Sequence, residues 1–327
     1  MAKNDDTLIL LVILGVGVFA YSKGWLSGPI NQLKGLFQGA GATPVPTPPA
    51  LPDTGTTIPG IPTSPGGQPI PDAKPNPTPP STGTGTGTSF IAVGDWDNKP
   101  ASSKTVAMAA SSGVPLILGL GDYPYDGDTK ASIQAVLRPI LSKMKAVLGN
   151  HEDNSWLSIW GQSSAEFTFN MGNVCFIMCN TEPNGSNSHV EAACAKAQAD
   201  PNIDFIVTCG HRPTTPNFAG VATGGVYDAK ANALVPIWNK YSKVKLVLSG
   251  HFHNYQRSKP ANAHGTVYCV VGTAGATLYS ARNKPAGVAV QVNGYHGFLR
   301  VDTTRAAMNC KFVTHNNGVM DSFVISK

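Results

Sequence analysis

The chain has 327 residues, enough for one large domain or two small ones. Only 13% of the residues are charged and the formal net charge is +5, with Lys and Arg scattered along the chain. Because nucleic-acid binding usually needs a basic patch or stripe, this pattern indicates no nucleic-acid partner. A mildly basic surface suits an anionic small substrate, and equally suits ordinary solvated charge.

The first segment, residues 1–26, contains an uncharged run of 16 residues at 7–22, followed by Lys23 and Trp25. As a helix this run spans about 24 Å, slightly short of a typical hydrocarbon core. Lys23 can extend to the headgroups and Trp25 can lie at the interface, so we predict an uncleaved transmembrane anchor. A cleaved signal segment ending near residues 18–20 and a buried helix are the alternatives.

The second segment, residues 27–88, is predicted to be a linker. Within it, residues 43–88 hold 14 of the 26 prolines, 7 glycines, three charged residues and no aromatic residue. Such a stretch cannot bury enough apolar surface to offset its ordering entropy. As a flexible coil its ends would lie roughly 40 Å apart. The remaining residues, 89–327, suit a single α/β domain.

The six cysteines show no CxxC spacing. Cys175 and Cys179 lie in VCFIMC, which is typical of a strand, where four residues cover about 13 Å. That distance is too long for the two to form a disulfide with each other. The six cysteines can therefore form longer-range disulfides or be buried free thiols, and their spacing does not determine the redox compartment.

From residue 89 onward, five apolar runs each end in a glycine followed by a polar residue: SFIAVGD, VPLILGLGD, KAVLGNHE, DFIVTCGH and VKLVLSGHFH. Each run predicts a strand buried on both faces. Helix-compatible stretches lie between them, at 102–112, 130–143, 190–199 and 229–241. Alternating strands and helices indicate βαβ units, whose functional groups collect at the carboxyl ends of the strands.

The polar residues at these ends form a set that suits metal binding: Asp95, Asp122, Asn150, His211, His251 and His253. Carboxylate, amide and imidazole ligands together suit first-row metals such as iron, manganese and zinc. These six side chains are more ligands than one tetrahedral metal site uses, whereas two metal ions that share one carboxylate would use all six. Two ions about 3.5–4 Å apart can clamp a phosphoryl group and activate water.

The order GD, GDxxY, GNH(D/E), a strand ending in His, then GHxH resembles the calcineurin-like metallophosphoesterases. The Tyr three residues after the second Asp resembles the purple acid phosphatase branch, as do GHRP, GHFHNYQRS at 250–258 and VVGTAG at 270–275. The resemblance covers nearly all of residues 89–326 and none of 1–88. It implies a four-layer α/β/β/α sandwich of two mixed sheets.

The resemblance also implies a ligand set. The first metal, ferric iron in the family, would be bound by Asp95, Tyr125 and His253. Asp122 would bridge both metals. The second metal, a divalent iron, zinc or manganese, would be bound by Asn150, His211 and His251. A trivalent cation can remove the phenolic proton of Tyr125, whose ordinary pKa is about 10, whereas Tyr123 is expected to point elsewhere.

His151 lies where the family places a residue beside the substrate. An imidazole there can hold a phosphate oxygen or protonate the leaving alkoxide, or else support a ligand by a hydrogen bond. His296 and His189 are weaker candidates for substrate contact, while His264 and His315 are expected on surface loops.

Asp97 stands where the branch usually has Gly. It is expected to cap the next segment and to lie near the metal without binding it, where it is also a candidate for substrate contact. The alternatives are that it is an added metal ligand or that it displaces Tyr125.

These observations predict a membrane-tethered or exported dinuclear-metal phosphatase that hydrolyses phosphomonoesters through a metal-bound hydroxide. A phosphodiesterase or nucleotide hydrolase on the same site is the nearest alternative, since specificity is expected in loops 182–189 and 213–226.

A third hypothesis is a structural component of a large membrane-containing assembly, such as a virion protein at its surface or membrane. The expected partners are accordingly a phosphate-ester substrate, the membrane through residues 7–26, and proteins of an assembly contacting the linker. The domain is expected on the extracytoplasmic side or secreted.

Overall fold

The computed structural model describes residues 10–14, 17–21, 87–214, 229–279 and 284–327. The chain falls into two units, Met1–Pro69 and Ile70–Lys327, and each is described by itself. The described part of the first unit is an antiparallel pair of strands, β1 (Leu10–Leu14) and β2 (Gly17–Tyr21). These ten residues differ from the helix predicted over 7–22. In the described part of the chain, no helix combines the length and apolar character needed to cross a membrane.

The second unit contains two mixed sheets. The six-stranded sheet has the order β15-β14-β13-β3-β4-β5, with bounds Val319–Ser326, Ala307–Thr314, Gly297–Thr303, Ser89–Val93, Leu116–Leu120 and Met144–Val147. The seven-stranded sheet has the order β12-β10-β11-β9-β8-β7-β6, with bounds Val288–Val292, Tyr255–Ser258, Val267–Val271, Val244–Ser249, Phe205–Cys209, Val174–Met178 and Phe167–Met171. The predicted α/β fold of two mixed sheets is therefore confirmed.

The two sheets pack face to face through large buried side chains. Phe90 of β3 meets Phe176 of β7 edge-to-face at 5.1 Å, and Tyr255 of β10 stacks on Phe312 of β14 at 4.1 Å. Aromatic pairs in these geometries add packing energy beyond the apolar area they bury. The main core thus lies between the sheets.

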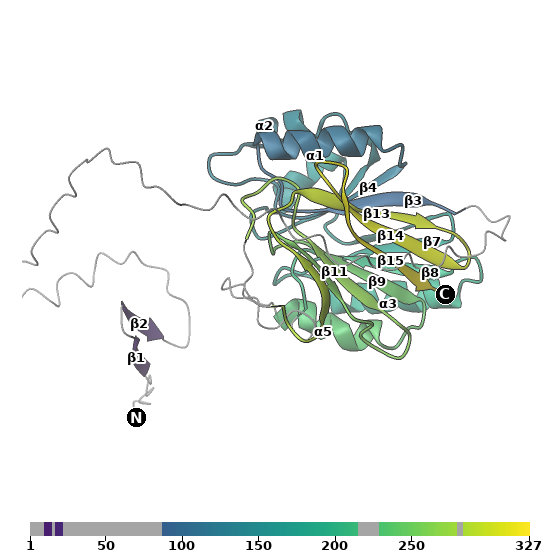
Figure 1. Cartoon of the computed structure of the whole chain (residues 1–327). Coiled ribbons are helices and arrows are strands. Elements are labelled where there is room, and N and C mark those ends of the chain that lie inside the picture. The colour runs from purple at the N-terminus through teal and green to yellow at the C-terminus, as the bar shows by residue number, and fades with distance from the viewer. Residues whose placement is uncertain (1–9, 15–16, 22–86, 215–228, 280–283) are drawn as a thin grey trace, which may run out of the picture. The chain divides into compact units, whose positions relative to one another are not determined.

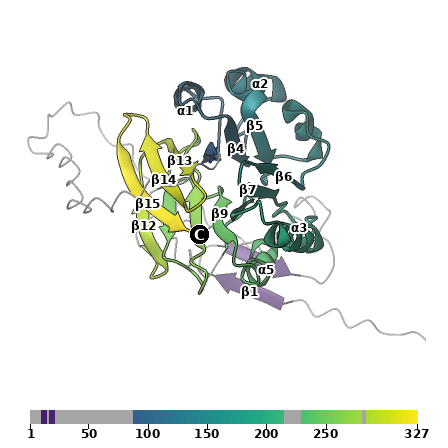
Figure 2. The same cartoon turned by 90° about the vertical axis from the view of Figure 1, so that its right-hand side faces the viewer.

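Helices cover the outer faces. Helices α1 (Pro100–Ser111) and α2 (Lys130–Leu137) lie on the side of the six-stranded sheet, and α3 (Asn187–Ala199) and α5 (Ala229–Trp238) on the side of the seven-stranded sheet (Figures 1 and 2). A second buried cluster joins α3 and α5 to alternate residues of β7, including Cys175 and Ile177. This alternation follows from the two-residue period of a strand.

All four predicted helices differ from the structure at one or both ends, and two of these differences have a local cause. Helix α3 begins at Asn187 instead of 190 because the hydroxyl of Ser186 caps it by accepting from the backbone N–H of His189. Helix α2 ends at Leu137 instead of continuing to 143, because Pro139 has no N–H to donate. A short 3-10 helix at Leu141–Lys143 follows.

All six cysteines are free and buried. Burial raises the pKa of Cys209 and Cys269 above the usual thiol range. The structure therefore favours buried free thiols, one of the two alternatives that the cysteine spacing left open.

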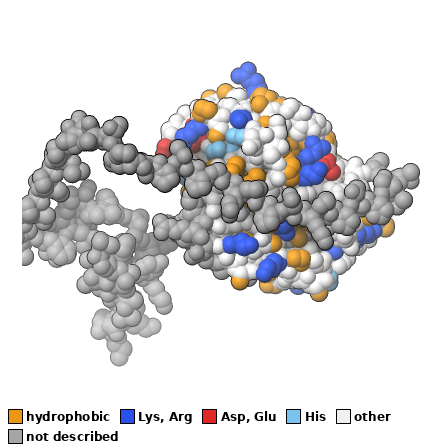
Figure 3. Space-filling view, in the orientation of Figure 1, with side chains coloured by type: hydrophobic (Ala, Val, Ile, Leu, Met, Phe, Trp, Pro, Cys, Tyr) orange, Lys and Arg blue, Asp and Glu red, His pale blue; other side chains and the backbone are white. Residues whose placement is uncertain are grey.

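On the face of the molecule that Figure 3 shows, the Lys and Arg side chains are scattered among uncharged ones.

Candidate metal centre

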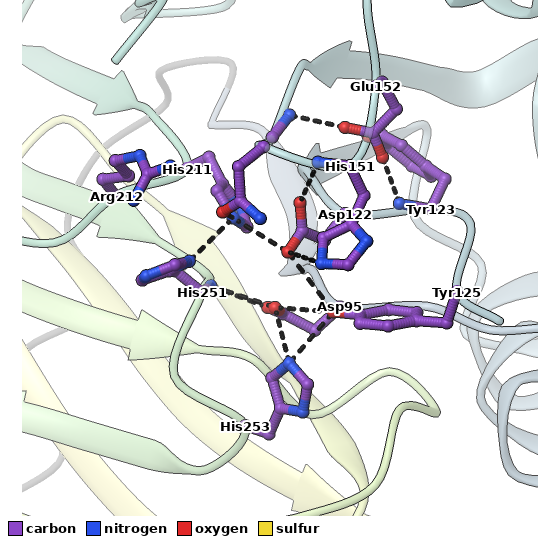
Figure 4. A network of polar contacts seen from close by, with 12 residues as sticks. Asp95, Asp122, Tyr123, Tyr125, His151, Glu152, His211, Arg212, His251 and His253 are labelled. Atoms are coloured by element: carbon purple, nitrogen blue, oxygen red, sulfur yellow. Dashed lines mark hydrogen bonds and ion pairs between the residues drawn. The ribbon is translucent and has the colours of Figure 1, made fainter. Parts of the chain in front are cut away.

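Five parallel strands end at one place. Asp95 follows β3, Asp122 follows β4, Asn150 follows β5, His211 follows β8, and His251 follows β9. Figure 4 shows the carboxylates and imidazoles of this set pointing toward one another. The backbone N–H of His251 donates to both oxygens of Asp95, at 3.1 and 2.9 Å, which joins the two sheets at the centre.

A first group of side chains surrounds the phenol of Tyr125. Its hydroxyl oxygen lies 3.2 Å from Oδ1 of Asp95, 3.4 Å from Oδ2 of Asp122 and 2.9 Å from Nε2 of His253. Nε2 of His253 is in turn 3.3 Å from Oδ1 of Asp95. Tyr125 and Asp122 therefore do face the same small space.

A second group surrounds Nε2 of His211. This atom lies 3.1 Å from Oδ2 of Asp122, 3.3 Å from Oδ1 of Asn150 and 3.2 Å from Nδ1 of His251. Asp122, His211 and His251 each offer one ligand atom, and these atoms all lie within 4.8 Å of one another. Because Asp122 contacts both groups through the same oxygen, it stands between them.

Backbone carbonyls orient two of the imidazoles. Nδ1 of His211 donates to the carbonyl of Leu120 at 2.8 Å, and Nδ1 of His253 donates to the carbonyl of Thr277 at 2.7 Å. In each ring the other nitrogen, Nε2, then faces the carboxylates with its lone pair. This arrangement is typical of metal-ligating histidines.

The backbone at the centre is strained. Asp95, Asp122 and His251 have φ values of 61°, 52° and 70°, a left-handed region that non-glycine residues rarely adopt. The neighbouring glycines leave no room for a side chain, since a Cβ on Gly149 would lie 2.1 Å from Oδ1 of Asp122. Strain of this kind persists where the surrounding structure over-determines it, and it is concentrated at functional sites.

The electrostatics also single out this cluster. Burial opposes protonation of His211, but the Asp122 carboxylate outweighs it and raises the pKa of His211 to about 10. Burial, with the positive charges of His211 and Arg212, lowers the pKa of His251 to about 3. Burial and the neighbouring carboxylates raise the pKa of Tyr125 far above its ordinary value. The carboxylates thus favour a positive charge beside these imidazoles. A metal ion, which takes each imidazole in its neutral form, would supply that charge, so the donor set fits a cation.

His151 lies at the open side of the centre. Its backbone N–H donates to Oδ1 of Asp122 at 3.2 Å, and its ring packs against Tyr125 with centroids 4.6 Å apart. Nε2 of His151 is 3.8 Å from Oδ2 of Asp122, and its side chain is 42% exposed. The imidazole is therefore placed beside the ligand groups and within reach of solvent.

The weaker candidates lie outside this network. The buried Asp97 forms an ion pair with Lys99, although the cap predicted for it is absent, because α1 begins with no side-chain cap. His296 approaches the carbonyl of Thr273 at 3.3 Å and stacks on His315. His315 lies in the turn after β14, as expected of a loop residue, but it is only partly exposed, and its Nε2 lies 2.8 Å from the hydroxyl of the buried Thr105.

Tyr123 points away from the centre, as expected. It is fully buried and packs against Trp160 with centroids 4.4 Å apart. Its backbone N–H donates to Oε1 of Glu152, and Oε2 of the same carboxyl group accepts from the N–H of Gly149 at 2.6 Å. Glu152 thus holds the turns after β4 and β5 together (Figure 4).

Two features of the centre were missed from the sequence. The ring of Tyr279 stacks on His253 at 4.2 Å and 12°, although no motif marks this tyrosine. Next to His211, the guanidinium of Arg212 donates two hydrogen bonds to the carboxylate of Glu182, at 2.9 and 3.1 Å. The predicted specificity loop 213–226 lies mostly outside the described residues.

Comparisons with known proteins identify the family and agree with the fold. The family model for calcineurin-like phosphoesterases matches residues 88–255. A purple acid phosphatase from yellow lupin seeds aligns with a TM-score of 0.63 at 16% identity, covering 74% of this chain and 54% of the lupin chain. The anchor protein GAP50 of the Plasmodium inner membrane complex aligns at 0.59 and 14%, covering 73% and 89%. A dimetal phosphatase from Danio rerio aligns at 0.52 and 12%, covering 73% and 98%.

At these identities the structural matches show the fold alone. The chain spans about half the length of the lupin phosphatase. A comparison with curated protein sequences found no match.

Proposed function

This chain belongs to the calcineurin-like phosphoesterase family, and from that premise we propose that it is a dinuclear-metal phosphatase hydrolysing phosphomonoesters. Family membership confirms the predicted class, that of metal-dependent phosphoric ester hydrolases. The substrate, the metals and the chain's own activity belong to the proposal.

The observation that carries the proposal is the position of Asp122. Its Oδ2 lies 3.4 Å from the phenol of Tyr125 and 3.1 Å from Nε2 of His211, so one carboxylate faces two groups of ligand-type side chains. A carboxylate that faces two groups of ligand-type side chains suits a pair of cations close together.

We assign the groups as follows. Asp95, Tyr125 and His253 would hold ferric iron, Asn150, His211 and His251 would hold a divalent iron, zinc or manganese ion, and Asp122 would contact both. Two such ions, when bound, would supply Lewis acidity toward the phosphoryl oxygens and a water molecule of lowered pKa. The purple acid phosphatase assignment rests on Tyr125, because a phenol is the ligand that favours a trivalent ion.

The remaining chemistry falls to His151. Its exposed imidazole lies beside Asp122, where it would hold a phosphoryl oxygen or give a proton to the leaving alkoxide. The carboxylates and the fixed imidazoles would hold the ions, and His151 would help to keep the phosphoryl group in one orientation.

The location is part of the same proposal. The uncharged run in residues 7–22 and the linker composition support a membrane-tethered or exported protein, with the domain on the extracytoplasmic side.

A second candidate function is structural. The Plasmodium anchor of a membrane complex has a similar fold, which supports the idea that this chain is a component of a membrane-containing assembly. The two functions are compatible.

The test uses the full-length chain purified after loading with iron and zinc. We expect about two metal ions per chain and hydrolysis of p-nitrophenyl phosphate in preference to bis(p-nitrophenyl) phosphate. Asp122→Asn should lower kcat by at least about 100-fold and reduce the metal content. Asp302→Asn, at an exposed strand position, serves as the matched control. A wild type that binds no metal and hydrolyses neither ester would contradict the proposed enzymatic activity and favour the structural function. Preference for the diester would favour a phosphodiesterase.

A further inference from the structure

An open polar pocket of about 530 Å³ lies between a segment that follows His151 in the chain and the loop that follows β7. One wall comes from residues 154–166, which begin three residues after His151. The other comes from Asn180 and Asn184, in the loop that follows β7.

The second wall is tied directly to the centre. The hydroxyl of Thr181 accepts from the backbone N–H of His211 at 3.0 Å and from that of Arg212 at 2.9 Å. Glu182, one residue further, holds the guanidinium of Arg212. The loop carrying Asn180 and Asn184 therefore extends outward from His211.

The pocket's chemistry is uncharged and polar apart from one carboxylate. Its described lining consists of three Asn, one Gln, four Ser, Glu166 and two apolar residues, with no aromatic, Lys or Arg side chain. The ammonium group of Lys130 contacts the pocket residue Ser155, donating to its carbonyl and hydroxyl. Amides and hydroxyls both donate and accept. Among the described residues, the side chains of Asn154, Ser163 and Asn184 donate no hydrogen bond to the protein, so these three match a ligand rich in hydroxyl groups.

The walls are already held in place. Gln162 exchanges two hydrogen bonds with the backbone of Ala146 in β5, at 2.8 and 2.9 Å. Oε1 of Glu166 accepts from the N–H of Ser186 at 2.7 Å, which holds this side chain in the wall. A pocket built in advance lowers the entropy cost of binding.

We propose that this pocket binds the polyhydroxylated alcohol part of the substrate, so that the enzyme acts on a phosphorylated sugar or polyol. The inference rests on the proposed phosphatase function. A nucleoside monophosphate fits less well, because bases are usually held by stacking on aromatic rings. A second phosphate would face Glu166 without a lining Lys or Arg.

The test compares two substrates of the metal-loaded full-length chain, glucose 6-phosphate and p-nitrophenyl phosphate. Ser163 is an exposed lining residue, and Ser163→Trp would fill the pocket. We expect this variant to lower the ratio of kcat/KM for glucose 6-phosphate to that for p-nitrophenyl phosphate by at least tenfold. Ser322→Trp, on β15 at the opposite edge of the six-stranded sheet from β5, should leave the ratio unchanged.

A wild type that hydrolyses the aryl ester but not the sugar phosphate would overturn the pocket assignment and leave the phosphatase standing. An equal ratio in Ser163→Trp and wild type would also overturn it. If neither ester is hydrolysed, the proposed function fails, and saturation-transfer NMR with unphosphorylated glucose decides on the pocket alone. Binding that Ser163→Trp abolishes and Ser322→Trp preserves supports the pocket, whereas no binding to wild type overturns it.

Discussion

Tyr125 is the residue on which the identity of the first metal depends. Burial and the nearby carboxylates of Asp95 and Asp122 raise its pKa, so the phenolate does not form there without added positive charge. A trivalent cation between these groups would reverse the sign of the local potential. Whether the phenol of Tyr125 is deprotonated therefore depends on the charge of the ion that occupies the site.

We expect the iron-loaded wild type to show a visible charge-transfer band that is lost in Tyr125→Phe. The band reports a phenolate on ferric iron, and the variant keeps the ring but removes the oxygen. Absorption spectra of the two proteins at equal iron content provide the measurement. Tyr279→Phe, which keeps the stacking on His253, is the control and should retain the band. A colourless wild type with bound iron would contradict the tyrosinate assignment.

His315 is expected to create a pH dependence of stability. Burial, with the charges of His296 and Lys104, lowers its pKa to about 4 from the ordinary 6.5. Because the folded pKa is the lower one, the neutral ring stabilises the fold above pH 6.5, and this contribution is lost as the pH falls from 6.5 through 4. His315→Gln should therefore lose less stability than wild type between pH 7 and pH 5 in urea unfolding. His264→Gln, at an exposed loop position, should follow wild type.

At the scale of secondary-structure elements, the turns after the strands determine the site. The turns after β4 and β5 carry Asp122 and Asn150, and Glu152 bonds to the backbone of both. A side chain that joins two ligand-bearing turns fixes their separation more firmly than either strand does alone.

We expect Glu152→Gln to weaken metal affinity by about 10- to 100-fold, because the amide can accept only one of the two N–H groups. Competition with a chelator followed by metal analysis measures this affinity. Gln162→Leu is the matched control, since it removes two hydrogen bonds to β5 at Ala146 and none to the ligand turns. It should lower the melting temperature while metal affinity stays at the wild-type value. Equal affinities in Glu152→Gln and wild type would contradict the positioning role.

At the scale of the whole second unit, Ile70–Lys327, one buried carboxylate joins the two sheets away from the metal centre. Asp204, directly before β8, is fully buried and pairs with Lys327 after β15 and with Arg305 between β13 and β14. Asn173 donates to the same carboxylate at 2.9 Å. Two cations at the ends of strands of the six-stranded sheet thus bind one carboxylate at the start of a strand of the seven-stranded sheet.

Asp204→Asn should lower the free energy of unfolding by about 1.5–3 kcal/mol, since it removes charge-assisted hydrogen bonds from a buried group. Asp302→Asn also breaks an ion pair, with Arg300, but at a side chain that is 43% exposed. We expect that control to cost no more than about 1 kcal/mol. Urea unfolding at pH 7 gives both values, and equal losses would contradict the structural role of Asp204.

Much of this architecture could be predicted from the sequence. The five apolar runs and the glycine-polar pairs that end them are local signals, and parallel strands place such ends at one edge. Predictions were less accurate where the competing signal was also local, as at Pro139, or where an apolar run such as residues 10–14 suits a strand as well as a helix.

The sequence by itself determined which chemical groups the centre contains, because motif spacing and the hydrophobic period are properties of neighbouring residues. Only the tertiary structure decided what surrounds them: the stacking of Tyr279 on His253, the pairing of Arg212 with Glu182, and the polar pocket between residues 154–166 and the loop after β7. These contacts join residues 26 to 30 positions apart, or whole segments from different strands. Their distances depend on how two twisted sheets pack, and no local pattern in the chain encodes that packing.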